Sequence, residues 1–246
     1  MTWPNNNTGL PAGIPRALAS SVIPVGIPSS GTVGDNGALT LTTALARTIS
    51  DGAYFYFPAG ALFAGSAAGL YWTVMSSTTA GVVYNNTYSS GDPAVPATLT
   101  PIAATGPGAY TQTTAEVFLR QTLVAAGTLG VNGMLRNTFK FTFPSSAGNK
   151  TLSVKLAGIA LYSRVRTTSV LENSMLTLMN RGRLDRQVEL TAMGSNGVPY
   201  TTAAASGGVT SHSLNLSVDQ IFAHTGQLAA ATDYIISEGS LLEVAR

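Results

Sequence analysis

Short runs in which apolar and polar residues alternate recur in the second half of this chain. Phe139–Phe143 alternates phenylalanine with lysine and threonine, and Leu152–Leu156 alternates branched apolar residues with serine and lysine. Such a period of two places one face of a β-strand in a core and leaves the other face in water. Pro144–Lys150, rich in serine and glycine, is predicted to be the loop between these two strands.

The same pattern predicts two sets of strands. The first set is Ala38–Leu45, Ala53–Phe57, Gly69–Ser76 and Gly81–Tyr84. No stretch has helical periodicity, so we predict an all-β fold, and many short strands favour a jelly-roll-like β-sandwich. The second set is Glu116–Val124, Leu135–Phe143, Lys150–Ala157, Gly158–Ser163, Met175–Met179, Gln187–Ala192, Ser213–Val218, and Thr232–Ile236 with Leu241–Val244.

The predicted organisation has three parts: an extended Pro-rich N-terminal arm at 1–30, a first β-module at 31–110 and the jelly-roll-like sandwich at 111–246. Recurrent prolines exclude a central strand or a helix from the arm. Its branched apolar residues have no local strand or helix to cover them. We therefore expect the arm to lie along a neighbouring subunit, and the sandwich to fold without it. The Pro-rich stretch Ser89–Gly108 is the expected boundary between the modules.

One sequence motif occurs twice in the chain. Gly31–Leu39 and Gly127–Leu135 both read G-T-[VL]-G-x-N-G-x-L. Asn-Gly adopts positive φ at little steric cost and signals a tight turn into a strand. The repeat predicts two β-modules built around the same kind of turn.

Charge is scarce in this chain. Charged residues make up 10% of it, against about 25% in ordinary globular proteins. Apolar residues make up 45%, which excludes the usual composition of a disordered chain. The chain has 26 glycines and 12 prolines, which disfavour helix interiors, and no cysteine, which excludes disulfides and thiol chemistry.

Neither a signal peptide nor a membrane span is expected. The N-terminus has no basic region followed by an apolar segment, and the longest uncharged apolar stretch, Ala53–Leu70, is interrupted by a proline and several glycines. We expect a protein that does not insert into a membrane.

Catalytic motifs are absent from the sequence, and we expect no enzyme, no cofactor and no metal site. His212 and His224 lack carboxylates at metal-ligand spacing, so each is expected to be an ordinary surface or core histidine. A glycosidase would need two facing carboxylates, and the sequence alone does not exclude such a pair. The carboxylates in or beside predicted strands are Glu116, Glu172, Glu189, Glu238 and Glu243.

One cluster of arginines raises the question of nucleic-acid binding. It lacks interleaved aromatic residues beyond Tyr162 and carries its own counter-charges, so we expect ion pairs on strand faces or between subunits, and no direct binding of nucleic acid. The cluster consists of Arg164, Arg166, Arg181, Arg183 and Arg186, with Glu172, Asp185 and Glu189 among them.

Several segments resemble a β-sandwich module common in virion proteins of tailed bacteriophages. The pieces are Gly130–Leu135, Phe139–Phe143, Gly148–Lys155, Met179–Gly182 and Thr225–Ala229, which follow the patterns G-x-N-G-x-L-R, N-x-K-T-[LI]-x-[VI] and T-G-Q-x-A. The family often has a tryptophan where this chain has Phe139. In the first module, Gly69–Trp72, Ser76–Gly81 and Tyr84–Tyr88 also look like phage structural protein.

The resemblance implies a non-enzymatic virion protein that decorates or joins the particle, as capsid decoration, head fibre or neck or tail appendage, attached through its arm. It also implies a homotrimer that contacts other virion proteins. An alternative is a receptor-binding fibre or spike tip that binds a host-surface glycan through Tyr84, Tyr88, Tyr110 and Tyr200. A surface-degrading enzyme is a third alternative. The sequence does not identify the binding residues.

Overall fold

All elements of the described structure are strands. The structure, a computed structural model, describes the backbone of residues 16–21, 24–27, 31–33, 38–41, 43–45, 54–57, 70–77, 81–85, 108–110, 116–191, 209–230 and 233–246. Side chains are described for 16–21, 24, 26, 43–45, 116–190, 210–230 and 233–246. No helix occurs among these residues, which confirms the all-β prediction.

The strands fall into two groups along the chain. The first group is β1 (Arg16–Ser21), β2 (Val25–Ile27), β3 (Gly31–Val33), β4 (Ala38–Leu41), β5 (Tyr54–Phe57), β6 (Leu70–Ser77), β7 (Gly81–Asn85) and β8 (Gly108–Tyr110). The second group is β9 (Val117–Val124), β10 (Met134–Thr142), β11 (Lys150–Leu156), β12 (Ile159–Arg166), β13 (Leu171–Asn180), β14 (Gln187–Thr191), β15 (Val209–His212), β16 (Gln220–Leu228) and β17 (Ile235–Ala245).

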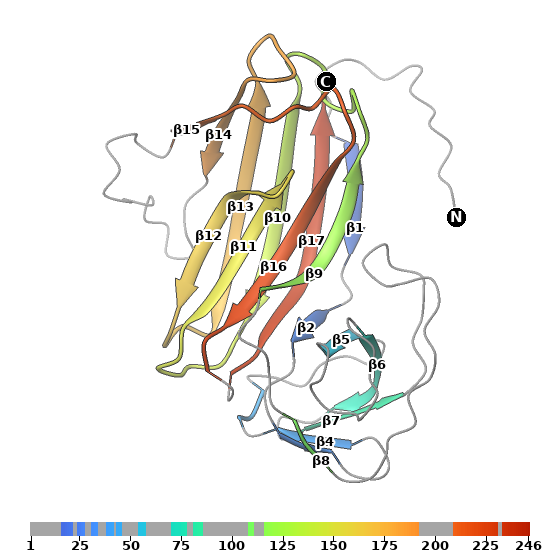
Figure 1. The fold of residues 1–246 in the computed structure, drawn as a ribbon, viewed down its shortest axis with the longest axis vertical. Coiled ribbons are helices and arrows are strands. Elements are labelled where there is room, and N and C mark those ends of the chain that lie inside the picture. Colours follow the sequence, from blue (N-terminus) through green and yellow to red (C-terminus); the bar gives the residue numbers. More distant parts are fainter. Residues whose placement is uncertain are drawn as a thin grey trace.

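Two antiparallel sheets form the sandwich (Figure 1). One, called sheet A here, has the order β15-β14-β13-β10-β17, with β1 paired to β17 on the side away from β10. The other, sheet B, has the order β12-β11-β16-β9. The chain crosses repeatedly between the sheets, so β1-β17-β10-β13 faces β9-β16-β11-β12. This arrangement of eight strands is that of a jelly roll, as predicted.

Strand β1 corrects part of the prediction for the N-terminal arm. Arg16–Ser21 pairs antiparallel with Ser240–Val244 of β17, and Leu18 and Ala19 pack against the core. The expectation that the arm has no strand of its own is therefore wrong for these residues. An edge strand pairs on one side only, and Arg16–Ser21 contains no proline that would remove a donor. The three-part division of the chain stays a prediction.

Strands β2 to β8 continue sheet A beyond the lower part of β17. Val25–Ile27 pairs with Ile235–Ser237, and the sheet then runs β2-β5-β6-β7-β4-β3-β8. The segment between β1 and β9 thus lies in the sequence between the first two strands of the jelly roll. The boundary expected at Ser89–Gly108 lies, apart from Gly108, outside the described residues.

The two copies of the repeated motif differ in structural context. In the first copy Gly31–Val33 pairs with Leu39–Leu41, so the two strands form a hairpin. In the second copy residues 127–133 form the loop that crosses from β9 in sheet B to β10 in sheet A. The motif therefore leads into a strand in both places, β4 in the first copy and β10 in the second, but the two copies are not equivalent modules.

Three strand predictions near the C-terminus need correction. Ser213–Val218 forms a loop, because its alternating Leu214 and Leu216 fill the end of the sandwich. Gln220–Leu228 forms the central strand β16, which the sequence prediction missed. Thr232–Ile236 and Leu241–Val244 were expected as two pieces, but Ile235–Ala245 is one strand with a register shift opposite Lys140 and Phe141.

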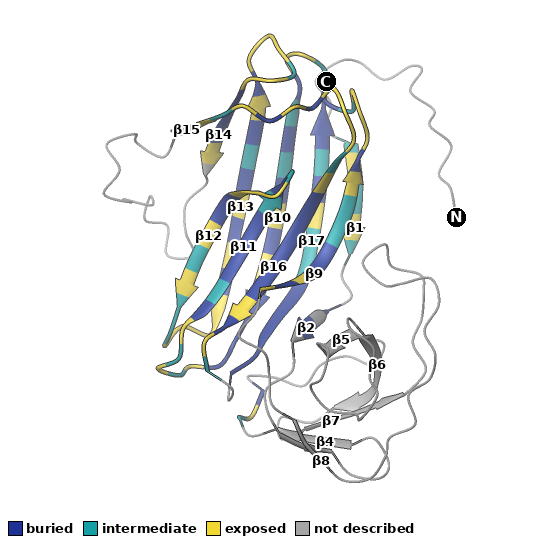
Figure 2. Ribbon diagram, viewed as in Figure 1, coloured by how far each residue is buried: buried dark blue, intermediate teal, exposed yellow. Residues whose placement is uncertain are grey.

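The core lies between the two sheets, and the buried residues of both are dark blue along the ribbons in Figure 2. Phe139, Phe141 and Phe143 are fully or almost fully buried there, as their alternation predicts. Sheet B contributes Leu152, Val154 and Leu156 from the second alternating run. Several polar side chains are buried with them, among them Arg120, Asn137, Lys150, His224 and Asp233.

Candidate functional site

Three loops meet at one end of the sandwich, away from β2–β8 (Figure 1). They are residues 125–133 between β9 and β10, 181–186 between β13 and β14, and 213–219 between β15 and β16; we call this end the tip. The amide of Gly127 donates to the carbonyl of Leu216 at 3.2 Å, and the amide of Leu216 donates to Leu184 at 3.0 Å. The amide of Asn180 donates to the carbonyl of Gly133 at 2.9 Å. These backbone bonds join the three loops into one platform.

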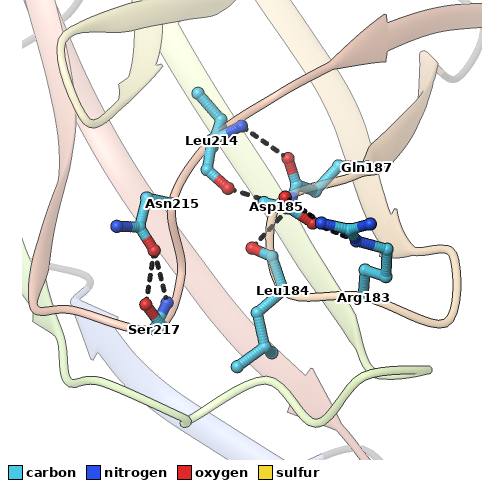
Figure 3. Close-up of polar contacts among 7 residues, drawn as sticks. All are labelled: Arg183, Leu184, Asp185, Gln187, Leu214, Asn215 and Ser217. Carbon is cyan, nitrogen blue, oxygen red and sulfur yellow. Dashed lines mark hydrogen bonds and ion pairs between the residues drawn. The ribbon is translucent and has the colours of Figure 1, made fainter.

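A pair of buried amide side chains, Gln187 and Asn180, holds the platform from inside; we call it the tip network, and Figure 3 shows Gln187 with its backbone partners Leu184 and Leu214. Gln187 Nε2 donates to the carbonyls of Leu184 at 2.9 Å and Leu214 at 3.1 Å, and to Asn180 Oδ1 at 3.2 Å. Gln187 Oε1 accepts from the amide of Leu214 at 2.8 Å. Asn180 Nδ2 reaches the carbonyl of Gly130 at 2.8 Å. One glutamine and one asparagine thereby satisfy backbone groups of all three loops.

Apolar residues and a glycine complete the tip. Leu129, Leu214 and Leu216 are buried, and Leu184 packs against the core. At Gly133 an added Cβ would lie 2.9 Å from the amide nitrogen of Gly130 and 3.1 Å from the carbonyl oxygen of Ala245. Only glycine fits this close approach. The loops are therefore pre-ordered, and binding to them would not require much further ordering.

Arginine is the commonest exposed ionisable residue of the tip. Residues 181–186 hold three of the chain's 13 Lys and Arg residues. Arg183 donates through Nε and Nη2 to the two carboxylate oxygens of Asp185, each at 2.7 Å (Figure 3). This bonding raises the pKa of Arg183 and lowers the pKa of Asp185. Arg181 and Arg186 are exposed beside this pair. A guanidinium donates in a planar fork that suits carboxylates and phosphates.

The opposite end of the sandwich, the base, is held by charged side chains, the base network. Lys150 Nζ donates to Ser146 Oγ at 2.6 Å and to the carbonyl of Gly148 at 2.8 Å, and lies 3.5 Å from Asp233 Oδ2. Ser146 Oγ donates to Asp233 Oδ1 at 2.6 Å. The side chains of Lys150 and Asp233 are both 0% exposed. A Cβ on Gly148 would collide with Asp233 and lie 2.7 Å from Cβ of Ala230.

A third polar cluster lies in the middle of the core around His224. Its Nε2 is 3.0 Å from Asn137 Oδ1, an acceptor, so this nitrogen carries the proton, and Nδ1 is 3.3 Å from Ser237 Oγ. Arg120 donates to Ser237 Oγ at 2.9 Å and to the carbonyl of Ser237 at 3.0 Å. Burial, assisted by the charge of Arg120, lowers the pKa of His224 to about 3. His224 is thus a neutral core histidine, as expected from the sequence.

The other predicted ionisable residues are found in separate local pairs. Glu172 accepts from Tyr162 and from Arg166, and His212 Nε2 lies 2.7 Å from Glu189. Ion pairs thus account for Arg166 and Arg183 of the arginine cluster, and Arg164 lies over the Tyr162 ring at 6.0 Å.

The remaining carboxylates also have separate partners. Glu238 accepts from Thr142, and Arg136 donates to Glu243 at 2.8 Å. Glu116 accepts from Lys155 at 2.6 Å and Thr225 at 2.5 Å. Burial alone would raise the pKa of Glu116, but these two hydrogen bonds outweigh it and lower the pKa.

The tyrosines expected to bind glycan are not placed as a group. Tyr84 is in β7 and Tyr110 in β8, where only the backbone is described, and Tyr88 and Tyr200 lie outside the described residues. Across the described residues, no cluster of three or more histidine, aspartate or glutamate side chains could hold a metal ion. The described part of the chain also has no helix suited to crossing a membrane.

Sequence analysis missed the residues that order the tip. Gln187 was expected only as the start of a strand, and no role was expected for Asn180. The available signal was the motif itself, because Gly130–Leu135 and Met179–Gly182 were both noted as similar to phage modules.

Comparisons with known proteins identify no family for this chain. No protein-family model and no curated protein matches the chain. Among solved structures, peanut lectin with a nine-residue peptide gives a TM-score of 0.29 at 7% identity, covering 55% of this chain and 84% of that one. Winged bean acidic lectin with methyl-α-D-galactose gives 0.29 at 6%, covering 88% and 98%. Dimeric latent PorU from Porphyromonas gingivalis gives 0.27 at 12%, covering 93% and 25%. The jelly roll of this chain is established by its own strand pairing.

Proposed function

We propose that this chain is a non-enzymatic structural protein of a tailed-bacteriophage particle, which decorates or joins the head, neck or tail. The observation that carries the proposal is the position of the motif residues behind the phage resemblance. Gly133 and Asn180 order the tip, while Gly148 and Lys150 order the base. The motifs are thus the residues that close the two ends of a jelly roll, a fold that viral capsid proteins use.

The environment of the carboxylates supports a role without catalysis. A glycosidase would need two carboxylates across a groove, one of them positioned to act on a substrate. In the described structure Glu172 and Glu238 are buried and bonded to neighbouring side chains, Glu116 and Glu243 each pair with a different cation, and Glu189 lies 2.7 Å from His212.

A second candidate function is recognition of a host-surface glycan by the tip. It is favoured by the pre-ordered platform and its exposed arginines, which would suit an acidic sugar. Under this proposal the N-terminal segment attaches the protein and the tip contacts the cell.

Immunogold electron microscopy can test the main proposal. Antibodies raised against the purified protein should label intact particles of the phage whose genome encodes this chain, at a constant position on head, neck or tail. Deleting residues 2–14, which leaves β1 in place, should preserve the melting temperature and abolish incorporation. Unlabelled particles would contradict the structural role, and normal incorporation of the truncated protein would contradict attachment through the arm.

Cell binding separates the two candidates. A fluorescent full-length protein should bind host cells only if the tip recognises a surface glycan, and Arg181→Ala with Arg186→Ala should then remove the binding. Labelled particles without cell binding favour decoration.

A further inference from the structure

We infer that Lys150 and Asp233 condense to an intramolecular amide, an isopeptide bond that joins the two sheets at the base of the sandwich. Lys150 is the first residue of β11 in sheet B, and Asp233 lies two residues before β17 in sheet A. The inference rests on the contacts of the base network, and it does not depend on the proposed function.

The amine and the carboxylate are enclosed together, but they are not in close contact as an ion pair. Both side chains are fully buried, and Lys150 Nζ lies 3.5 Å from Asp233 Oδ2. At the partly exposed pair of Lys155 and Glu116 the corresponding distance is 2.6 Å. Burying two charges costs hydration that such a pair does not fully recover, so the pair is weak evidence for a stabilising role. A neutral amide in the same place would contain no charge to desolvate.

Ser146 connects the two reacting groups. Its Oγ accepts a hydrogen bond from Lys150 Nζ at 2.6 Å and donates one to Asp233 Oδ1 at 2.6 Å. A hydroxyl in this position can take a proton from the ammonium while it gives its own proton to the carboxylate. The pair then consists of an amine, which is the nucleophilic form of lysine, and a carboxylic acid.

The loop before β11 holds both reactants in place. After the proton transfer Nζ keeps two hydrogens, and the carbonyl oxygens of Gly148 and Ser146 lie 2.8 Å and 3.4 Å from it. The lone pair of Nζ is then free to turn toward Cγ of Asp233. A Cβ on Gly148 would lie 2.3 Å from Asp233 Oδ2 and 3.3 Å from Cγ, so the glycine lets the carboxyl group pack against the loop. Reactants fixed in contact react as if at very high concentration.

The reaction is a condensation that needs no other reagent. The lone pair of Lys150 Nζ forms a bond to Asp233 Cγ, which becomes tetrahedral. A second proton then passes from Nζ through Ser146 to the Oδ1 hydroxyl, the Cγ–Oδ1 bond breaks, and Oδ1 leaves as water. The product is an amide with Oδ2 as its carbonyl oxygen and one hydrogen on Nζ. Ser145 and Asn149 are exposed in the same loop, so the released water is close to solvent.

The bond would join two parts of the sandwich that are 83 residues apart in the sequence. One is β11, which lies between β12 and β16 in sheet B. The other leads into β17, which pairs with β10, β1 and β2 in sheet A. The sheets could then separate at the base only if a covalent bond broke, whereas hydrogen bonds of the tip network hold the other end.

Intact-mass spectrometry of the full-length protein provides the first test. Wild type should be lighter than its sequence by the mass of one water. Lys150→Arg keeps the cation but has no primary amine, so it should keep that water, and comparison with it cancels any processing at the N-terminus. Ser146→Ala lacks the proton relay and should react roughly 100-fold more slowly, so a freshly purified sample should keep most of its water. A wild-type protein that keeps its full mass after prolonged incubation would overturn the inference.

The pair of Lys155 and Glu116 is the matched control. It also combines a lysine and a carboxylate with a hydroxyl, because Thr225 donates to Glu116 at 2.5 Å. Its lysine and glutamate side chains are 22% and 38% exposed, so water solvates both charges and the condensation is not expected there. Lys155→Arg should therefore show the same loss of water as wild type. A loss that disappears in Lys155→Arg would place the bond at the control pair and overturn the inference.

Peptide mapping provides the second test, because it locates the bond. Trypsin cannot cleave after a lysine whose amine has become an amide. Residues 141–155 should therefore stay uncut at Lys150 and remain joined to residues 187–246 in one branched peptide. If the missing water is found in an unbranched peptide, the chain contains a dehydrated aspartate such as a succinimide, and the inference is wrong.

Discussion

The two ends of the sandwich are held by chemically different networks. At the tip, the neutral amides of Gln187 and Asn180 bond to backbone groups of three loops. At the base, Lys150 and Asp233 form a fully buried ion pair that Ser146 bridges. Both networks join loops that are distant in the sequence, and both contain residues of the motifs described in the sequence, Asn180 at the tip and Lys150 at the base.

The difference predicts unequal tolerance to substitution. A neutral amide that is removed leaves a few backbone groups without partners. A charge that is removed from a buried pair leaves the other charge unpaired in a medium that solvates it poorly. The base should therefore depend on both of its partners, whereas the tip should lose stability in smaller steps.

The largest effect is expected at the base. Lys150→Met should lower the free energy of unfolding by about 3 to 5 kcal/mol, because Asp233 remains buried without its cation. Urea unfolding followed by tryptophan fluorescence or circular dichroism measures this change. Adding Asp233→Leu should recover part of the loss. The matched control is Lys155→Met, which breaks the partly exposed pair with Glu116 and should cost less than about 1 kcal/mol. Equal losses for the two lysines would refute the special role of the buried pair.

Acidification should destabilise the sandwich through His224 in its middle, so both ends should lose stability together. The pKa of His224 is about 3 in the folded protein and about 6.5 when unfolded, so the unfolded state binds the proton first as the pH falls. The stability due to neutral His224 is fully present above pH 6.5 and is lost from there towards pH 3. Between pH 7 and pH 4 the loss should be about 3 kcal/mol.

Hydrogen exchange measured by mass spectrometry can locate this acid effect. After correction for intrinsic rates, exchange should rise at tip and base alike. His224→Gln, which cannot titrate, should be less stable at pH 7 and lose less of its stability on acidification. A variant with the same pH dependence as wild type would show that another group is responsible.

A smaller effect is expected at the tip. Gln187→Leu should destabilise the protein by about 1 to 3 kcal/mol, because the amide of Leu214 and the carbonyls of Leu184 and Leu214 lose a buried partner. Exchange should increase at residues 181–186 and 213–219 before it increases at the base. Gln220→Leu, which removes an exposed bond to the carbonyl of Asn215, is the control and should have little effect. A loss as large as that of Lys150→Met would remove the distinction between the ends.

The smallest effect is expected at the exposed tip arginine. Arg183→Ala breaks a pair with Asp185 that water and salt screen, so the unfolding midpoint should not change measurably. A clear drop in the midpoint would mean that the pair orders the loop. An unchanged midpoint would make this variant suitable for binding experiments, because any change in recognition would then come from the side chain.

Much of the fold could be predicted from local pattern. The alternation in Phe139–Phe143 and Leu152–Leu156 placed β10 and β11 to within a residue or two, and the scarcity of helix-forming residues agreed with the absence of helices from the described part of the chain. These features depend on neighbouring residues, which a period of two reports directly.

Other elements could not be predicted from local alternation. β16 was missed because Phe222 to Gly226 is buried without a break, and its glycine, histidine and threonine do not alternate with apolar residues. Ser213–Val218 does alternate, but Leu214 and Leu216 fill the end of the core from a loop. Periodicity reports which residues are buried, and it does not report which element buries them.

The sequence alone determined the fold class and the sparse charge, since each follows from residue types and their spacing. Tertiary structure decided that Arg16–Ser21 completes the jelly roll, because its partner strand lies more than two hundred residues further along the chain. It also decided that Gln187 meets Leu214 and that Lys150 meets Asp233. Such contacts depend on which strands become neighbours in the sheets, and no local pattern carries that information.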